Sequence, residues 1–192
     1  YKNLQKEKLK MVAENNMKSK NNAIKKIKKQ YIEEYLMKQT PDESQIKGYM
    51  KTLQNDGSWS NINYNDKSDK WKVAEHLRKL LSMAKSYSNP ESNLFKNKDL
   101  RKKIIEAFDF WVKNNFKDPN SWWYNEIFVP RHVGDIYLLI EDIVSEGSSQ
   151  KAKKIINWGT KRRKPDKPAI GTNLLFYQRN VIILALIENN FE

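Results

Sequence analysis

The 192-residue sequence contains no cysteine, only 2 histidines, and no run of about 18 apolar residues. The lack of cysteine excludes disulfide bonds, thiolate metal ligands and a cysteine nucleophile. The lysine-rich first residues, YKNLQKEKLK, contain no apolar core of an export signal, so such a signal is absent or already removed. Two distant histidines alone make a poor metal site. We therefore expect no metal, no other cofactor and no membrane partner.

Glycine and proline are also sparse, at 6 residues each, and the alternating patterns typical of strands are missing. Apolar residues instead recur at steps of three and four, which predicts an all-α chain. A polar stretch near residues 15–22 interrupts the first pattern. Pro41 is expected in the first turn of the second helix, and Ser148 or Ser149 is expected to cap the sixth. About seven helices are predicted, in segments 9–36, 41–53, 71–87, 98–116, 130–144, 148–163 and 173–190.

Three of the predicted connections are long and turn-rich, namely residues 55–70, 117–126 and 164–172. Alternating short and long loops are typical of a ring of antiparallel helical hairpins, in which the long loops meet at one end. The last helix contains VIILALI, which has no polar residue and must be surrounded by other elements. We therefore expect that the chain is truncated at its C-terminal side and belongs to a larger domain.

The net charge of +13 raises the possibility of a polyanionic partner such as a nucleic acid. Its distribution weakens that interpretation. Residues 1–40 contain 11 Lys and Arg residues against 4 Asp and Glu residues, whereas the other 152 residues contain 25 against 19. Much of the basicity thus belongs to an opening helix region, residues 1–40, whose lysines are expected to form a solvated face. We expect no nucleic-acid partner.

Aromatic residues gather in the predicted loops, beside asparagine, serine and glycine. The segment NSWWYNEI, residues 120–127, places three aromatic residues in a row, which no helix or strand buries on one face. Exposed aromatic rings with neighbouring amides bind sugars by stacking and hydrogen bonding, and they also stack on nucleic-acid bases. The alternative is that individual rings close the ends of helices. The residues concerned are Trp59, Tyr64, Trp122, Trp123 and Tyr124.

The ionisable residues near these loops do not define an active site by themselves. A glycosidase needs two carboxylates about 5–10 Å apart, and a sequence does not reveal that distance. Helix capping and ion pairing explain each carboxylate equally well. Asp135 is expected either to lie at the surface or to form an ion pair between two helices. His76 and His132 are assigned structural roles. The carboxylates considered are Asp56, Asp66, Glu126 and Asp135.

Four motifs in order resemble the N-terminal domain of the eighth polysaccharide lyase family, which includes chondroitin AC, hyaluronate and xanthan lyases. They are DGSWSNINY, HLRKLLSMAKSY, SWWYNEIFVPRHVGDIYLLI and IGTN at the start of the last helix. The resemblance covers about residues 40–192 and is greatest to the chondroitin AC lyases. It implies an incomplete α/α toroid, with residues 1–192 as the N-terminal portion of one catalytic domain. It also implies cleavage of uronate-containing polysaccharide by β-elimination.

The resemblance assigns roles to several residues. Trp122 and Trp123 match tandem tryptophans that stack on sugar rings, and Asn125 matches the polar residue after them. Asn173 matches an asparagine that binds the uronate carboxylate and is the one catalytic candidate here. Trp59 and Tyr124 complete the expected substrate-binding set, and no metal ligands are assigned. Two positions depart from the family pattern: Ser121 replaces asparagine and Phe128 replaces glycine, so the loop's shape is expected to differ.

The leading hypothesis is therefore an N-terminal fragment of a secreted or periplasmic polysaccharide lyase acting on a chondroitin- or hyaluronan-like polymer. In the family, a histidine and a tyrosine from later helices transfer the protons, and their motifs do not occur here. We expect the isolated chain to be inactive and its partner to be the C-terminal remainder of the same enzyme. Two alternatives remain: a non-catalytic carbohydrate-binding helical module, and a basic nucleic-acid-binding domain that uses residues 1–40.

Overall fold

The computed structural model describes residues 2–161 and 170–189, which form seven α-helices and no β-strand. A 3₁₀-turn, Lys72–Ala74, precedes α3, and two π-helical turns occur, η1 (Tyr31–Leu36) and η3 (Tyr124–Phe128). The predicted all-α fold with seven helices is confirmed. The helices are α1 (Lys2–Gln30), α2 (Glu43–Thr52), α3 (Glu75–Ser88), α4 (Lys98–Asn114), α5 (Val129–Ile140), α6 (Glu146–Trp158) and α7 (Thr172–Glu188).

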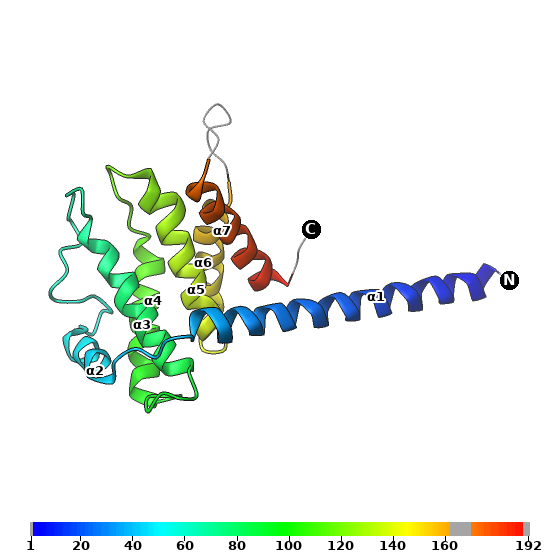
Figure 1. Cartoon of the computed structure of the whole chain (residues 1–192), viewed down its shortest axis with the longest axis horizontal. Coiled ribbons are helices and arrows are strands. Elements are labelled where there is room, and N and C mark those ends of the chain that lie inside the picture. The colour runs from blue at the N-terminus through cyan, green and yellow to red at the C-terminus, as the bar shows by residue number, and fades with distance from the viewer. Residues whose placement is uncertain (1, 162–169, 190–192) are drawn as a thin grey trace.

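The helices pack in two layers (Figure 1). Helix α5 lies between α3 and α7, and α4 packs against α6 on the other side. The sequential pairs α3–α4 and α5–α6 form hairpins, since short connections favour antiparallel neighbours. This arrangement is an incomplete α/α toroid, as predicted.

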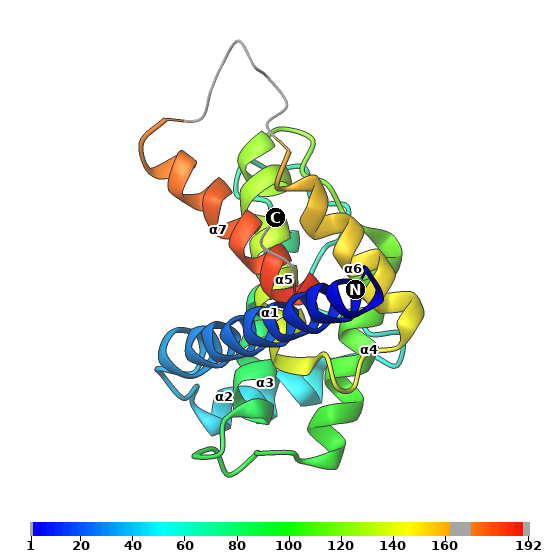
Figure 2. The same ribbon diagram turned by 90° about the vertical axis from the view of Figure 1, so that its right-hand side faces the viewer.

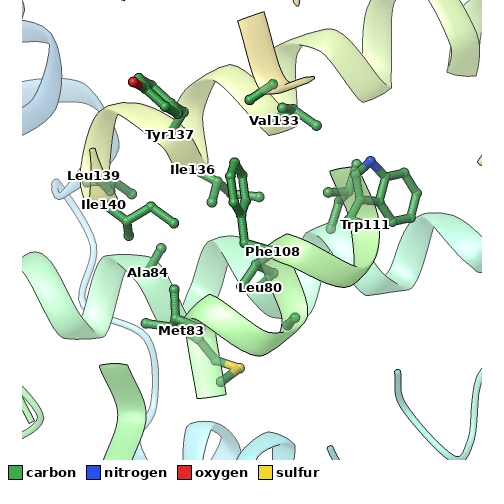
Figure 3. Close-up of a cluster of buried hydrophobic side chains, with 14 of the residues drawn as sticks. Leu80, Met83, Ala84, Phe108, Trp111, Val133, Ile136, Tyr137, Leu139 and Ile140 are labelled. Carbon is green, nitrogen blue, oxygen red and sulfur yellow. The ribbon is translucent and has the colours of Figure 1, made fainter. Parts of the chain in front are cut away.

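The core lies between the two layers (Figure 3). Leu80 and Met83 from α3 meet Phe108 from α4 and Ile136 from α5, and none of these side chains is more than 1% exposed. The spacing of the buried residues along each helix is that of the apolar pattern in the sequence. The core therefore fixes the orientation of α3, α4 and α5 and, with them, the loops at their ends.

Helix α1 projects from this body, and its N-terminal part lies far from the other helices (Figures 1 and 2). The polar stretch 15–22 interrupts the apolar pattern but not the predicted helix, because one continuous helix runs from Lys2 to Gln30. Residues 14–23 are exposed, so this part of α1 needs no apolar face. Among the side chains of α1 that the structure describes, Ile24 is the first buried apolar one, at 2% exposure.

Two predicted helix starts also move. Asp42, rather than Pro41, precedes α2 directly, and its carboxylate accepts hydrogen bonds from the backbone N–H groups of Ser44 and Gln45. Helix α6 is capped by Ser145, whose Oγ accepts from the backbone N–H of Ser148 at 3.3 Å. In both cases the cap is a side chain that accepts a hydrogen bond from a backbone N–H of the first helical turn. None of the described helices is both long and apolar enough to cross a membrane.

Two of the three long loops meet at one end of the body. Asn120 donates a hydrogen bond through Nδ2 to the carbonyl of Lys67, and the Tyr124 hydroxyl donates to the carbonyl of Lys70. Residues 115–121 also reach the end of α6, where Nζ of Lys117 lies 5.6 Å from the ring centroid of Trp158. Most of the third predicted loop, residues 164–172, lies outside the described part of the chain.

Candidate functional site

The segment NSWWYNEI is helical from Trp122 onward, so its prediction as a loop is wrong. The helix passes through η3 and continues directly into α5. Pro130 explains the π-helical turn, because it has no backbone N–H with which to bond the carbonyl of Glu126. That carbonyl instead accepts a hydrogen bond from Nδ2 of Asn180 at 3.1 Å, on α7. The turn thus joins the aromatic segment to α7, and π-helical turns of this kind are frequent at functional sites.

The two tryptophans of this segment have different environments. Trp122 is 51% exposed and borders a pocket together with residues 117–121 and Trp158. The Trp123 ring is partly buried and contacts Phe176 on α7, with 6.5 Å between ring centroids. Adjacent residues of a helix point about 100° apart, so the two rings serve different sides of η3.

Asn173 occupies the first turn of α7 and is partly buried. Phe176, Tyr177 and Asn180 follow at helical spacing on the same face. All three contact the tryptophan segment: the ring of Phe176 meets Trp123, the hydroxyl of Tyr177 donates to the Glu126 carboxylate, and Asn180 donates to the Glu126 carbonyl. The α7 face that carries Asn173 is therefore the face packed against the tryptophan segment.

Arg131 adds a positive charge next to this face. Its guanidinium carbon lies 5.3 Å from the ring centroid of Phe176, one turn after Asn173. Burial lowers the pKa of Arg131, and the nearby charge of Arg179 lowers it further. Arg131 was not predicted as a site residue, because an arginine in VPRHVGD belongs to no distinctive motif. Only its packing against Phe176 associates it with Asn173.

Tyr124 and Asn125 are engaged within the protein. The ring of Tyr124 packs edge-on against Trp71, at 5.2 Å, and its hydroxyl bonds the carbonyl of Lys70. The amide of Asn125 accepts from the backbone N–H of Asp118 at 2.9 Å and donates to the Asp118 carbonyl at 2.8 Å. Asn125 therefore braces the loop before Trp122. Both residues hold the segment in place. These contacts within the protein explain why an aromatic residue and an amide occupy positions 124 and 125, without any contact to a substrate.

Phe128, where the resemblance led us to expect glycine, is buried and stacks on His132 with 3.8 Å between ring centroids. It also contacts the rings of Trp123 and Tyr124. The larger side chain thus fills space beneath the aromatic segment and supports it. Ser121 is partly buried and borders the pocket beside Trp122.

The assignment of Trp59 to substrate binding is wrong. Its side chain is 1% exposed, its Nε1–H donates to the carbonyl of Tyr49 at 3.0 Å, and its ring meets His76 edge-on. A ring enclosed on both faces has no surface to offer a sugar. The sequence places Trp59 in a polar loop, but that loop folds back so that the ring enters the core between α2 and α3.

Both histidines are buried, neutral and structural. Nε2–H of His76 donates to the carbonyl of Ala107, and its Nδ1 accepts from the hydroxyl of Tyr64, each at 2.9 Å. His132 bonds the carbonyl of Phe128 through Nδ1. Burial lowers the pKa of each histidine to about 3. Neither ring is placed to remove a proton from a substrate.

The carboxylates near the loops also have local roles. Asp56 accepts hydrogen bonds from Ser58, and Asp66 accepts from the backbone N–H groups of Ser68 and Lys72. Asp135 is buried rather than at the surface, and its carboxylate pairs with Arg179 at 2.6 Å. No cluster of three potential metal ligands occurs within residues 2–161 and 170–189.

These features define an all-helical α/α domain with an aromatic cluster at the end where its long loops meet. The sequence model of polysaccharide lyase family 8, N-terminal alpha-helical domain, matches residues 6–192. The chain therefore belongs to this family. The similarity expected from the sequence motifs is confirmed.

Two characterised relatives are similar over part of the chain. Chondroitinase-AC of Pedobacter heparinus is 28% identical over 120 residues, which are 62% of this chain and 16% of that protein. Xanthan lyase of Bacillus sp. strain GL1 is 29% identical over 98 residues, or 48% of this chain and 9% of that protein. The chain thus matches only a small share of the length of either enzyme.

Solved structures of polysaccharide lyases have a similar fold. A chondroitinase AC lyase structure superposes with a TM-score of 0.67 and 26% identity, covering 81% of this chain and 24% of that one. A xanthan lyase from Paenibacillus has the same fold, with a TM-score of 0.63 and 19% identity, covering 92% of this chain and 15% of that one.

Proposed function

We propose that this chain is the N-terminal part of the catalytic domain of a secreted or periplasmic lyase that cleaves uronate-containing polysaccharide by β-elimination. The observation that carries the proposal is the packing of the tryptophan segment against the α7 face that begins with Asn173, within a family 8 domain. The chondroitinase-AC similarity favours a chondroitin- or hyaluronan-like polymer. Trp122 and Trp123 would contact sugar rings, and Asn173 would contact the uronate carboxylate.

The chemistry of β-elimination explains the need for an amide at this place. Removal of the proton at C5 of a uronate leaves negative charge on C5. The adjacent carboxylate is already negative, so its charge opposes this step. An amide N–H that donates to the carboxylate stabilises the enolate-like transition state. The guanidinium of Arg131 lies over Phe176, which is one turn after Asn173 on the same face of α7, and would add a favourable positive potential.

Both histidines and the tyrosines Tyr64 and Tyr177 are poor candidates for the two proton transfers. His76 and His132 are buried with pKa values of about 3. Burial raises the pKa of Tyr64 to about 12, and its hydroxyl is bonded to His76. The hydroxyl of Tyr177 is bonded to Glu126. We therefore propose that the base and the acid come from a remaining part of the same enzyme.

A comparison of two polypeptides tests this proposal. The 192-residue chain alone should release no unsaturated uronate from chondroitin or hyaluronan, as followed by ultraviolet absorbance. The same chain joined to the following part of its polypeptide should be active. A robust absorbance increase from the isolated chain would refute the division of the catalytic residues. Binding without cleavage by the longer polypeptide would instead indicate a carbohydrate-binding module.

A further inference from the structure

The C-terminal half of α1, which extends away from the body in Figure 1, is strongly basic. Residues 15–32 contain six lysines and no aspartate or glutamate. Three of the lysines, Lys18, Lys25 and Lys29, follow at steps of seven and four residues, which places them on one face of the helix. We call these three residues the lysine row. All three are exposed, so the row presents its charge to solvent.

The described residues do little to neutralise the lysine row. Within that part of the chain, Lys18 and Lys25 form no ion pair, and the ammonium group of Lys29 lies 3.8 Å from the Glu33 carboxylate. Both partners of this pair are exposed, so it contributes little. Lys25 and Lys29 are four residues apart, and like charges at this spacing repel each other along a helix. A bound anion would relieve this repulsion, so the row suits a negatively charged partner.

A pocket with a volume of about 460 Å³ lies at the body end of the lysine row. Lys25 and Lys29 border it, together with residues that directly follow α5 and α7. The apolar side chains of Ile32 and Met37 also line it. A linear polymer that follows the row therefore reaches a cavity that offers both positive charge and apolar surface, as ligand sites commonly do.

This pocket retains positive charge. Three lysines border it, and its two carboxylates belong to Glu33 and Glu141. Glu141 pairs with Lys28 at 2.6 Å, and Glu33 lies 3.8 Å from Lys29. Lys25 has no carboxylate partner among the described residues. An anionic sugar at this pocket would thus meet one uncompensated ammonium group.

The composition and spacing of α1 favour a polysaccharide over a nucleic acid. Residues 2–30 contain no arginine and no aromatic residue, which are the side chains that most often pair with or stack on bases. The helical rise separates Lys18 and Lys25 by roughly 10 Å, whereas the charges of a DNA duplex follow at about 1.7 Å. A uronate polymer with one carboxylate in each disaccharide matches such sparse charges better.

We infer that the lysine row and the pocket at its end form a second binding surface for the acidic polysaccharide, separate from the Asn173 face. The inference rests on the proposed function, which supplies the identity of the polyanion. Asn173 lies in the first turn of α7 and Asn189 of the pocket directly follows its last residue, so the two surfaces are about 24 Å apart along this helix. A long polymer contacts both surfaces, whereas a short oligosaccharide at Asn173 does not. The second surface holds the polymer near the site between cleavage events.

Binding of fluorescently labelled hyaluronan polymer to the 192-residue chain tests this surface. The triple variant Lys18→Gln/Lys25→Gln/Lys29→Gln should bind about tenfold more weakly at low salt, because three modest, exposed charge contacts are lost. The loss should shrink when the salt is raised from about 50 mM to about 300 mM, since exposed charges are screened.

The matched control is Lys51→Gln/Lys98→Gln/Lys151→Gln. These lysines are also exposed but lie on α2, α4 and α6, so the control removes the same net charge at other places. Its affinity should stay within about twofold of wild type. Equal weakening by the two triple variants, or none by either, would overturn the second surface. Tighter binding of a DNA duplex than of hyaluronan through the lysine row would overturn the choice of a polysaccharide.

The activity of the longer polypeptide separates this inference from the proposed function. Loss of the lysine row should raise KM for the polymer about tenfold and leave kcat and the cleavage of a tetrasaccharide unchanged, because only uniform binding is removed. Polymer cleavage with an unchanged KM would overturn the second surface and leave the proposed function intact. Absence of any uronate cleavage, with binding that still depends on the lysine row, would support the surface and contradict the proposed function.

Discussion

The ion pair between Asp135 and Arg179 should stabilise the packing of α5 against α7. The Asp135 side chain is 4% exposed and that of Arg179 20%. The carboxylate accepts from Nη2 of Arg179 at 2.6 Å and from the hydroxyl of Tyr31 at 2.7 Å. Burial lowers the pKa of Arg179, but Asp135 and the phenols together raise it; burial raises the pKa of Asp135. The raised pKa of Asp135 favours its protonated form, whereas the raised pKa of Arg179 requires that Asp135 be ionised. The two donors aimed at the Asp135 carboxylate favour the ionised pair at neutral pH.

The expected effects follow from this burial. Arg179→Met leaves the Asp135 carboxylate buried without its cation and should lower the free energy of unfolding by about 3 kcal/mol. Asp135→Asn leaves Arg179 able to reach water and should cost about 2 kcal/mol. The double variant should cost about 3 kcal/mol rather than the sum, which gives a coupling of about 2 kcal/mol.

Urea unfolding of the four proteins at pH 7, followed by circular dichroism, measures this coupling. A second readout is the pH dependence of the Arg179→Met deficit. Without the arginine, the pKa of buried Asp135 rises further above its unfolded value, so the folded variant binds a proton more readily than the unfolded chain. Its deficit relative to wild type should therefore shrink as the pH falls from 7 towards 4. Additive costs with a pH-independent deficit would refute the reasoning.

Two further predictions concern packing and pH. A Cβ added at Gly159, which caps the C-terminus of α6, would lie 2.4 Å from the Pro130 ring, so Gly159→Ala should lower the free energy of unfolding by about 1–3 kcal/mol. Gly147, in the first turn of α6, has open space, so Gly147→Ala should not be destabilising. Equal stabilities of the two variants in thermal denaturation would contradict this. Because the pKa values of His76 and His132 are lowered to about 3, the unfolded chain takes up protons first as the pH falls below 6.5. Stability should decrease by about 1.4 kcal/mol per pH unit for each histidine between pH 6.5 and about 3, and His132→Asn should reduce that slope in urea titrations at pH 7, 6 and 5.

The helices were predictable because each packed helix repeats apolar residues at the spacing of its buried face. Leu77, Leu80 and Ala84 of α3 show this directly. Apolar spacing is less informative where burial does not control the sequence. The exposed stretch 15–22 of α1 is helical without an apolar pattern, and the helical segment from Trp122 bonds α7 through the Glu126 carbonyl, a contact between distant segments that the local sequence does not show.

The candidate site was predicted less completely than the fold. A polar loop surrounds Trp59 in the sequence, and only the folded loop shows that its ring enters the core. Asn125 has the right residue type for a sugar contact, but its amide is bonded to the backbone of Asp118. Trp158 and Arg131 join the site through contacts between distant segments, which have no signature in a single sequence.

We propose that Asn173 stabilises the charge that develops on a uronate during elimination. The most direct test of this proposal is the kcat of the longer, active polypeptide with and without Asn173→Ala, followed by the absorbance of the unsaturated product. Loss of one donor to a developing anion predicts a decrease in kcat of about 100- to 1,000-fold, with the fold retained in circular dichroism. Wild-type turnover by Asn173→Ala would contradict the assigned role.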